Sequence, residues 1–129
     1  MKTLQSSKTL KFDLSDDQEV FLEINISSTG VWSTYVSVPG MEGFEYEERK
    51  KIGLFKDLKG KTIEINHEFS FENIPQKNLD NALQQTQVTY AVLNVIGPLQ
   101  PFKKRTSKDL DKEYRISAVK FITVEHIIL

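Results

Sequence analysis

The stretch that decides the fold is KTIEINHEFSF, residues 61–71. Its side chains alternate in character, which is the two-residue period of a β-strand with one buried face and one wet face. The inward face is apolar apart from one histidine, and it consists of Ile63, Ile65, His67, Phe69 and Phe71. The opposite face is polar and consists of Glu64, Asn66, Glu68, Ser70 and Glu72. We therefore expect a half-buried strand here and a mostly β fold.

The same period recurs along most of the chain. A tight turn at Gly30 precedes residues 31–38, whose register places Trp32 on the inward face. Residues 88–96 are apolar on both faces, which is typical of a central strand. The first two strand candidates are expected to form a hairpin across the Ser15–Gln18 turn. In all, the candidates cover residues 10–14, 20–26, 31–38, 52–54, 61–71, 88–96 and 114 to near the C-terminus.

One short helix is expected near residues 76–86. Pro75 ends the preceding strand pattern, because proline has no backbone N–H to donate to a neighbouring strand. Leu79, Ala82 and Leu83 then recur at the three- and four-residue spacing of an amphipathic helix. This is the one helix that the sequence predicts.

These elements favour a two-sheet antiparallel β-sandwich, because a βαβ fold would need repeated crossover helices. A closed β-barrel of the same strands is the alternative. The two-residue period shows which residues share a face of a strand, but it does not show which strands lie side by side. The chain has 129 residues, a usual length for one domain, so a single domain over residues 1–129 is expected.

Composition excludes several classes of function. Seventeen Lys and Arg residues against 18 Asp and Glu residues give a net charge of −1, which offers no general attraction to nucleic acid. The chain has no cysteine, so disulfides, thiolate metal sites and a cysteine nucleophile are absent. The sequence holds no apolar run long enough to span a membrane and no signal-peptide pattern before Asp16. We therefore expect a soluble, cytoplasmic protein that binds neither nucleic acid nor membrane.

Catalytic motifs are missing from the sequence. There is no Gly-x-Ser-x-Gly elbow, and the segment Gly60–Thr62 lacks the glycine spacing and the following helix of a phosphate-binding loop. The chain has two histidines, His67 and His126. His67 lies among apolar residues, which predicts a core histidine bonded to the backbone. The sequence therefore favours a protein that is not an enzyme.

Metal and cofactor sites are not predicted either. His67, His126 and Glu125 could form a facial metal triad if the strands that carry them were neighbours. Two acidic clusters near Asp16 and Asp111 lack the glycine and the spacing of a calcium loop. No metal ligands and no cofactor are therefore assigned.

Two charged segments are the candidate contact regions. Residues 41–51, read as an exposed connection, carry four glutamates followed by three basic residues. Residues 97–113, read as a long polar loop, carry a basic cluster beside an aromatic ring. The candidate binding residues are Phe44, Tyr46, Phe102, Lys103, Lys104 and Arg105. The two segments have opposite charge, so they would either join copies of the chain or neutralise each other within one subunit.

From these signals we expect a non-enzymatic protein-binding or assembly module, as a subunit of a homo- or hetero-oligomeric complex. The apolar C-terminal end, Ile127–Leu129, offers a further pairing surface. The alternative is a module that binds a small ligand, a carbohydrate or a lipid, through aromatics such as Tyr35 or between the sheets. A small enzyme that uses His67 is the third hypothesis.

Overall fold

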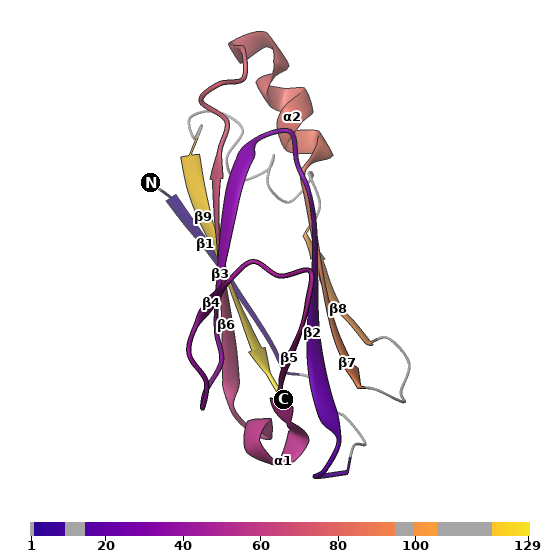
Figure 1. The fold of residues 1–129 in the computed structure, drawn as a ribbon. Coiled ribbons are helices and arrows are strands. Elements are labelled where there is room, and N and C mark those ends of the chain that lie inside the picture. Colours follow the sequence, from indigo (N-terminus) through magenta and orange to yellow (C-terminus); the bar gives the residue numbers. More distant parts are fainter. Residues whose placement is uncertain (1, 10–14, 95–99, 106–119) are drawn as a thin grey trace.

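The computed structural model describes residues 2–9, 15–94, 100–105 and 120–129, and for residues 2–9, 93–94 and 100–105 it describes the backbone. Two sheets face each other and enclose the core (Figure 1). The five-stranded sheet consists, in spatial order, of β1 (Lys2–Thr9), β9 (Lys120–Ile128), β6 (Thr62–Ser70), β3 (Val31–Ser37) and β4 (Phe44–Glu45). The four-stranded sheet consists of β5 (Arg49–Leu54), β2 (Glu19–Ser27), β7 (Gln87–Asn94) and β8 (Gln100–Arg105).

This arrangement confirms the two-sheet β-sandwich and rules out the closed barrel. Neighbouring strands run antiparallel with one exception, the parallel pair of β1 and β9. In that pair the two ends of the described chain lie side by side, with Lys2 opposite Phe121 and Thr9 opposite Ile128. The sequence did not indicate a strand over residues 2–9, and the strand expected at 10–14, with its hairpin, lies outside the described residues.

The strand that decides the fold lies where its pattern predicts. β6 is the middle strand of the five-stranded sheet, between β9 and β3, and its inward side chains are at most 1% exposed. Tyr90, Leu22 and Ile24 of the four-stranded sheet are equally buried on the opposite side. The core is therefore the layer of side chains between the two sheets, and its centre is apolar and aromatic.

The expected helix is confirmed and a second one was missed. A 3₁₀ turn, η1 (Gln76–Asn78), leads into α2 (Leu79–Gln85), with Leu79, Ala82 and Leu83 buried. The missed helix is α1 (Phe55–Leu58), one turn at the other end of the sandwich (Figure 1). Phe55 and Leu58 are both buried, since residues three apart share a helix face. In the sequence, one such pair is too short a pattern to predict a helix.

Both of the segments predicted to be loops contain strands. The segment 41–51 is exposed or half-buried throughout and leads from β3 to β5, as an exposed connection would, but it also includes β4 and the start of β5. The segment 97–113 includes β8 over residues 100–105, and its remainder lies outside the described residues. Charged residues hid these strands because β5 and β8 are the outer strands of their sheet, where charge is common.

The described residues include no helix that is both long enough and apolar enough to cross a membrane.

Candidate functional site

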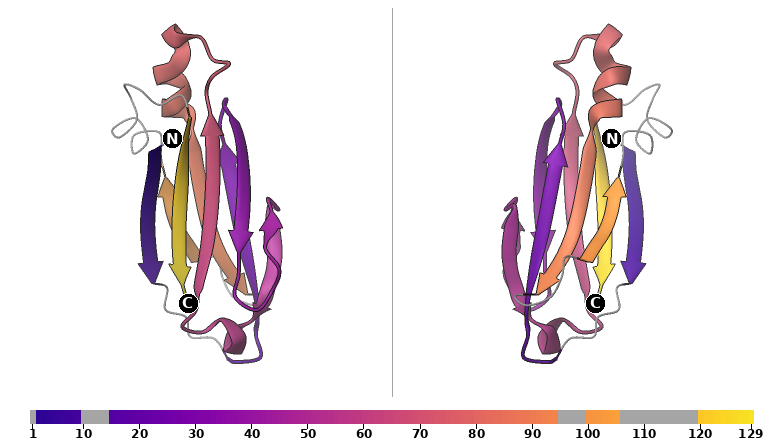
Figure 2. Two further views of the ribbon diagram at one scale, coloured as in Figure 1. Left: turned by 90° about the vertical axis from the view of Figure 1, so that its left-hand side faces the viewer. Right: turned by 90° about the vertical axis from the view of Figure 1, so that its right-hand side faces the viewer.

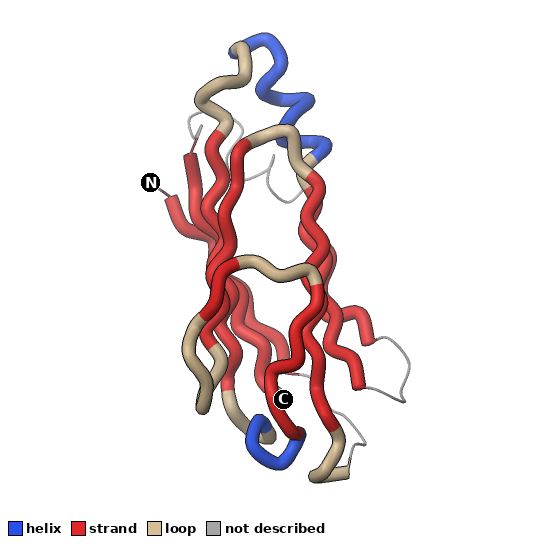
Figure 3. Tube along the Cα trace, viewed as in Figure 1, coloured by secondary structure: helices blue, strands red, loops and turns tan. Residues whose placement is uncertain are grey.

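The two sheets are connected by a short crossing segment, Tyr46–Glu48, which runs from β4 to β5 (Figure 3). It is held on β2 by two hydrogen bonds to one residue. The Tyr46 hydroxyl donates to the carbonyl oxygen of Ile24 at 3.0 Å, and the Ile24 N–H donates to the carbonyl oxygen of Glu48 at 2.9 Å. These two bonds fix the position of the crossing segment relative to Ile24 of β2.

Beyond the crossing segment, β3 has an open edge, Val31–Thr34. β4 pairs with Tyr35 and Val36 only, so within the described residues no strand lies beside Val31–Thr34 on the side away from β6. Residues 31–34 are Val, Trp, Ser and Thr, with neither a charge nor a proline. An edge of this kind presents backbone N–H and C=O groups to solvent without the usual protection.

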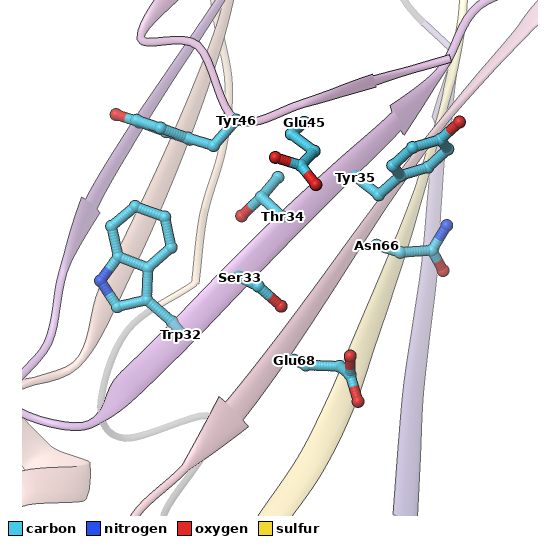
Figure 4. Close-up of a pocket in the computed structure, with 8 residues that line it drawn as sticks. All are labelled: Trp32, Ser33, Thr34, Tyr35, Glu45, Tyr46, Asn66 and Glu68. Carbon is cyan, nitrogen blue, oxygen red and sulfur yellow. The ribbon is translucent and has the colours of Figure 1, made fainter.

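A hollow of about 370 Å³, the edge pocket, lies beside this open edge. Its lining residues come from β3, β4, the crossing segment and β6, and they are Trp32, Ser33, Thr34, Tyr35, Glu45, Tyr46, Asn66 and Glu68 (Figure 4). Most of the polar ones face solvent, whereas Thr34 is buried. The pocket therefore combines three aromatic side chains with several polar ones on rigid strands.

The aromatic side chains of the pocket have defined positions. Trp32 and Tyr46 pack edge to face, with ring centroids 4.9 Å apart and planes at 78°. The Tyr35 ring lies against Gly43, where any Cβ would collide with it, and Tyr35 stays 48% exposed. Trp32 is half-buried at the margin of the core, so the prediction that it points inward holds for its strand face but misses its exposure at the pocket.

The electrostatic environment of the pocket is negative. Its two charged lining residues, Glu45 and Glu68, are both exposed carboxylates, and no basic residue lines it. Burial raises the pKa of Tyr46 above its usual value of 10.0, and the negative charges of Glu48 and Glu23 raise it further. Tyr46 therefore stays a neutral hydrogen-bond donor to Ile24 at physiological pH.

A second hollow, of about 240 Å³, continues from the edge pocket along β3. The two hollows share Trp32, Ser33 and Glu68, and the second adds Val31, which is 65% exposed. Lys120 also lines the second hollow, where its ammonium lies 3.4 Å from the Glu72 carboxylate. The surface beside the open edge is therefore hollowed along its length.

His67 lies in the core directly behind the pocket. It is 0% exposed, its Nδ1 lies 2.6 Å from the Thr34 hydroxyl, and its Nε2 bonds the Tyr90 hydroxyl of the opposite sheet. The prediction of a core histidine is confirmed, and its two ring nitrogens contact the side-chain hydroxyls of Thr34 and Tyr90. A neutral imidazole donates a hydrogen bond through one ring nitrogen and accepts one through the other. A single tautomer of His67 can therefore bond the Thr34 and Tyr90 hydroxyls at the same time.

The hypothetical metal triad does not assemble. β6 and β9 are neighbours, as the triad required, but His67 faces the core whereas His126 faces outward beside Glu64, with Nε2 at 3.6 Å from the carboxylate. Glu125 is buried on the inner face. Among the described residues, no group of three His, Asp or Glu side chains is placed to hold a metal ion.

The predicted binding residues are divided between two sides of the molecule. Phe44 and Tyr46 lie on the side of the crossing segment, and the Lys50 ammonium lies 5.0 Å above the Phe44 ring. Phe102–Arg105 lie on β8, at the other end of the four-stranded sheet (Figure 2). Three strand spacings, about 14 Å, separate β8 from the position of β5. β5 and β8 therefore lie at opposite edges of the four-stranded sheet, and the rest of the segment 97–113 lies outside the described residues.

Sequence reasoning missed most of the pocket. It named Tyr46 and, for the alternative function, Tyr35, but it did not single out Trp32, Asn66 or Glu68. The usable signal was the uncharged run at residues 31–38 in a chain with 17 basic and 18 acidic residues. Such a run marks either a central strand or an unprotected edge, and strand order decides between them.

Comparison of the chain with protein-family models, with curated proteins and with solved structures finds no match.

Proposed function

We propose that this protein is a binding or assembly module that takes up an extended segment of a partner protein along the open edge of β3. In this mode of recognition the partner adds a strand to a sheet, and its backbone bonds the N–H and C=O groups of the edge. Alternate side chains of the added strand then face the hollows beside β3.

The observation that carries the proposal is the lack of protection along Val31–Thr34. Proteins usually defend a strand edge with charge, proline or a bulge, because a bare edge pairs with other chains. This edge has neither a charged residue nor a proline, and its pairing with β6 runs without a register shift. The large apolar residues that are exposed among those described are Val31, which belongs to the edge, and Tyr35, which follows it.

Charge near the edge favours a basic partner segment. Glu45 and Glu68 line the edge pocket, and Glu48 lies in the crossing segment. Carboxylates beside an interface attract basic segments and repel acidic ones. The partner that fits is therefore an extended, positively charged segment of another protein, and a second copy of this chain is the competing occupant. A cytoplasmic location stays a sequence-based expectation.

The test is selection of extended peptides from a displayed random library, followed by mapping of the bound peptide through backbone amide shifts. We expect the shifts to centre on Val31–Thr34. The double variant Val31→Lys, Ser33→Lys places charge beside the edge and is expected to weaken binding by at least about tenfold, or 1.4 kcal/mol.

The matched control is Ser37→Lys, which adds a lysine on the same exposed face of β3 but beyond the open edge. Its peptide affinity should equal that of the unmodified chain. Shifts centred on β5 or β1, or equal loss in the control, would contradict the proposal. Light scattering over a range of concentrations, without peptide, separates a foreign partner from a second copy.

A second candidate function is binding of a small neutral ligand such as a carbohydrate. The supporting observation is the set of aromatic rings beside polar groups in one hollow, which is the composition of many small-ligand sites. A panel of sugars, fatty acids and nucleotides at about 1 mM tests it by thermal shift, since a ligand of the folded state raises the midpoint. The enzyme hypothesis has the least support, because the His67 ring has no exposed surface.

A further inference from the structure

We infer that the edge pocket recognises an organic cation, the guanidinium or ammonium group of a basic side chain on the bound segment. The inference rests on the proposed function for the source of the cation. It makes a separate claim about the chemistry of the pocket, which single amino-acid derivatives can test without any peptide.

The charged groups that line the pocket are both hydrogen-bond acceptors. Glu45 and Glu68 contribute carboxylates. The Asn66 side-chain amide donates one N–H to the Glu64 carboxylate at 2.8 Å, and its carbonyl oxygen is a further acceptor. An acceptor-rich site suits a ligand that only donates, and a guanidinium has five N–H donors and no acceptor.

Two of the hydroxyl groups that line the pocket are engaged elsewhere. The Tyr46 hydroxyl donates to the Ile24 carbonyl oxygen at 3.0 Å. The Thr34 hydroxyl is 2.6 Å from His67 Nδ1 inside the core. No lysine or arginine lines the pocket. An anionic ligand would therefore meet two carboxylates without a compensating charge.

The aromatic side chains favour a cation as well. A cation over an aromatic ring is attracted by the negative face of the ring, most strongly for tryptophan. Trp32 and Tyr46 hold each other edge to face at 4.9 Å, and Tyr35 stands across the pocket beside Asn66 (Figure 4). Tyr35 lies on the outer face of β3 with Glu45 and Glu68, whereas Trp32 and Tyr46 lie on the other side of the strand. A guanidinium can therefore stack on the Tyr35 ring while its N–H groups reach a carboxylate.

The position of the pocket links this chemistry to the open edge. Trp32, Ser33 and Thr34 belong to both features. A strand added along β3 would lie about 4.8 Å away, and its side chains would alternate between the two faces of the sheet. One basic residue of such a strand would therefore project over the edge pocket, where Glu45 and Glu68 lie.

The experiment titrates the protein with N-acetyl-arginine amide and with its neutral isostere, N-acetyl-citrulline amide. Trp32 is the one tryptophan of the chain, so its fluorescence reports on the pocket directly. We expect millimolar binding of the arginine derivative, at least about fivefold weaker binding of citrulline, and weakening by salt. Glu45→Gln should weaken arginine binding by roughly two- to fivefold.

The control is Glu19→Gln, which removes the same charge at a half-exposed residue on β2 that is paired with Lys51 and lies outside both hollows. Its arginine affinity should be unchanged, and thermal melts should show both variants folded. Equal binding of citrulline and arginine, equal loss in both variants, or no arginine binding up to about 50 mM would overturn the inference.

The two proposals fail differently. If selected peptides bind the open edge but lack basic residues, the cation inference is wrong and the proposed function stands. If the arginine derivative binds in the pocket but no peptide binds along Val31–Thr34, the cation site stands and the proposed function is wrong.

Discussion

The open edge of β3 and the edge formed by β8 are both strand edges of one sandwich, but they differ in every device that controls strand pairing. β8 carries Pro101 and three consecutive basic residues, and its pairing with β7 shifts register between Tyr90 and Ala91. Each of these features discourages the addition of another strand. Val31–Thr34 has none of them. This difference fits the proposal that Val31–Thr34 accepts a strand from a partner, whereas β8 does not pair with another chain.

The largest expected effect comes from removing the protection of β8. The triple variant Lys103→Thr, Lys104→Thr, Arg105→Thr replaces charge with residues that favour strands. We expect its mean mass to rise with concentration relative to the unmodified chain, by self-association along β8. Light scattering after size exclusion measures this.

The control for that variant removes three positive charges away from strand edges, by Lys56→Thr, Lys59→Thr and Lys77→Thr. It has the same net charge as the β8 variant. Identical masses for the two variants would show that net charge, and not edge protection, governs association.

The next largest effect concerns the side chains beside the open edge. Trp32→Ala removes a half-buried ring that packs on Tyr46, and we expect the free energy of unfolding to fall by about 2 kcal/mol, less than for a fully buried tryptophan. Val31→Ala, at a residue that is 65% exposed, should cost less than about 0.5 kcal/mol. Urea denaturation measures both losses. Equal losses would show that the packing of Trp32 on Tyr46 contributes little to the free energy of unfolding.

A smaller effect follows from the hydrogen bond of the crossing segment. Tyr46→Phe removes the bond to the Ile24 carbonyl oxygen, and we expect a loss of about 1 kcal/mol in urea denaturation near neutral pH. A variant as stable as the unmodified chain would mean that water replaces the hydroxyl at no cost.

The same variant tests the raised pKa of Tyr46. Because the folded protein favours the neutral phenol, the stability that Tyr46 contributes is present below its unfolded pKa of 10.0 and is lost as the pH rises through the higher folded pKa. The unfolding free energy of the unmodified chain should therefore fall more steeply above pH 10.0 than that of Tyr46→Phe. Parallel curves between pH 9 and pH 11 would contradict the shift.

The smallest effect is expected at the charged edge of β5. The Lys51 ammonium lies 2.7 Å from the Glu19 carboxylate, but both side chains are about half exposed. Such a surface pair contributes little, so Lys51→Gln should change the unfolding free energy by less than about 0.5 kcal/mol. A loss above about 1 kcal/mol would show that the charges on β5 stabilise the fold, in addition to discouraging the pairing of another strand.

The candidate site was predictable only in pieces. Tyr46 and Phe44 were selected because they lie among glutamates, and Tyr35 because it is a strand aromatic. The sequence grouped Phe44 and Tyr46 with Phe102–Arg105, which the structure places on the far side. Trp32 and Glu68 are 36 residues apart and meet through the pairing of β3 with β6. A pattern within one strand contains no information about that pairing.

What the sequence determined by itself is the assignment of residues to faces. Side chains alternate along a strand whatever its neighbours, so the burial of Ile63, His67 and Phe71 followed from spacing alone, as did the helix after Pro75. Strand order was decided by the tertiary structure. β1 pairs with β9, β8 is the last strand of its sheet, and β4 pairs with only Tyr35 and Val36 of β3, which leaves one side of Val31–Thr34 open among the described residues. Edges and pockets depend on contacts between residues far apart in sequence, which only the packing of the whole chain selects.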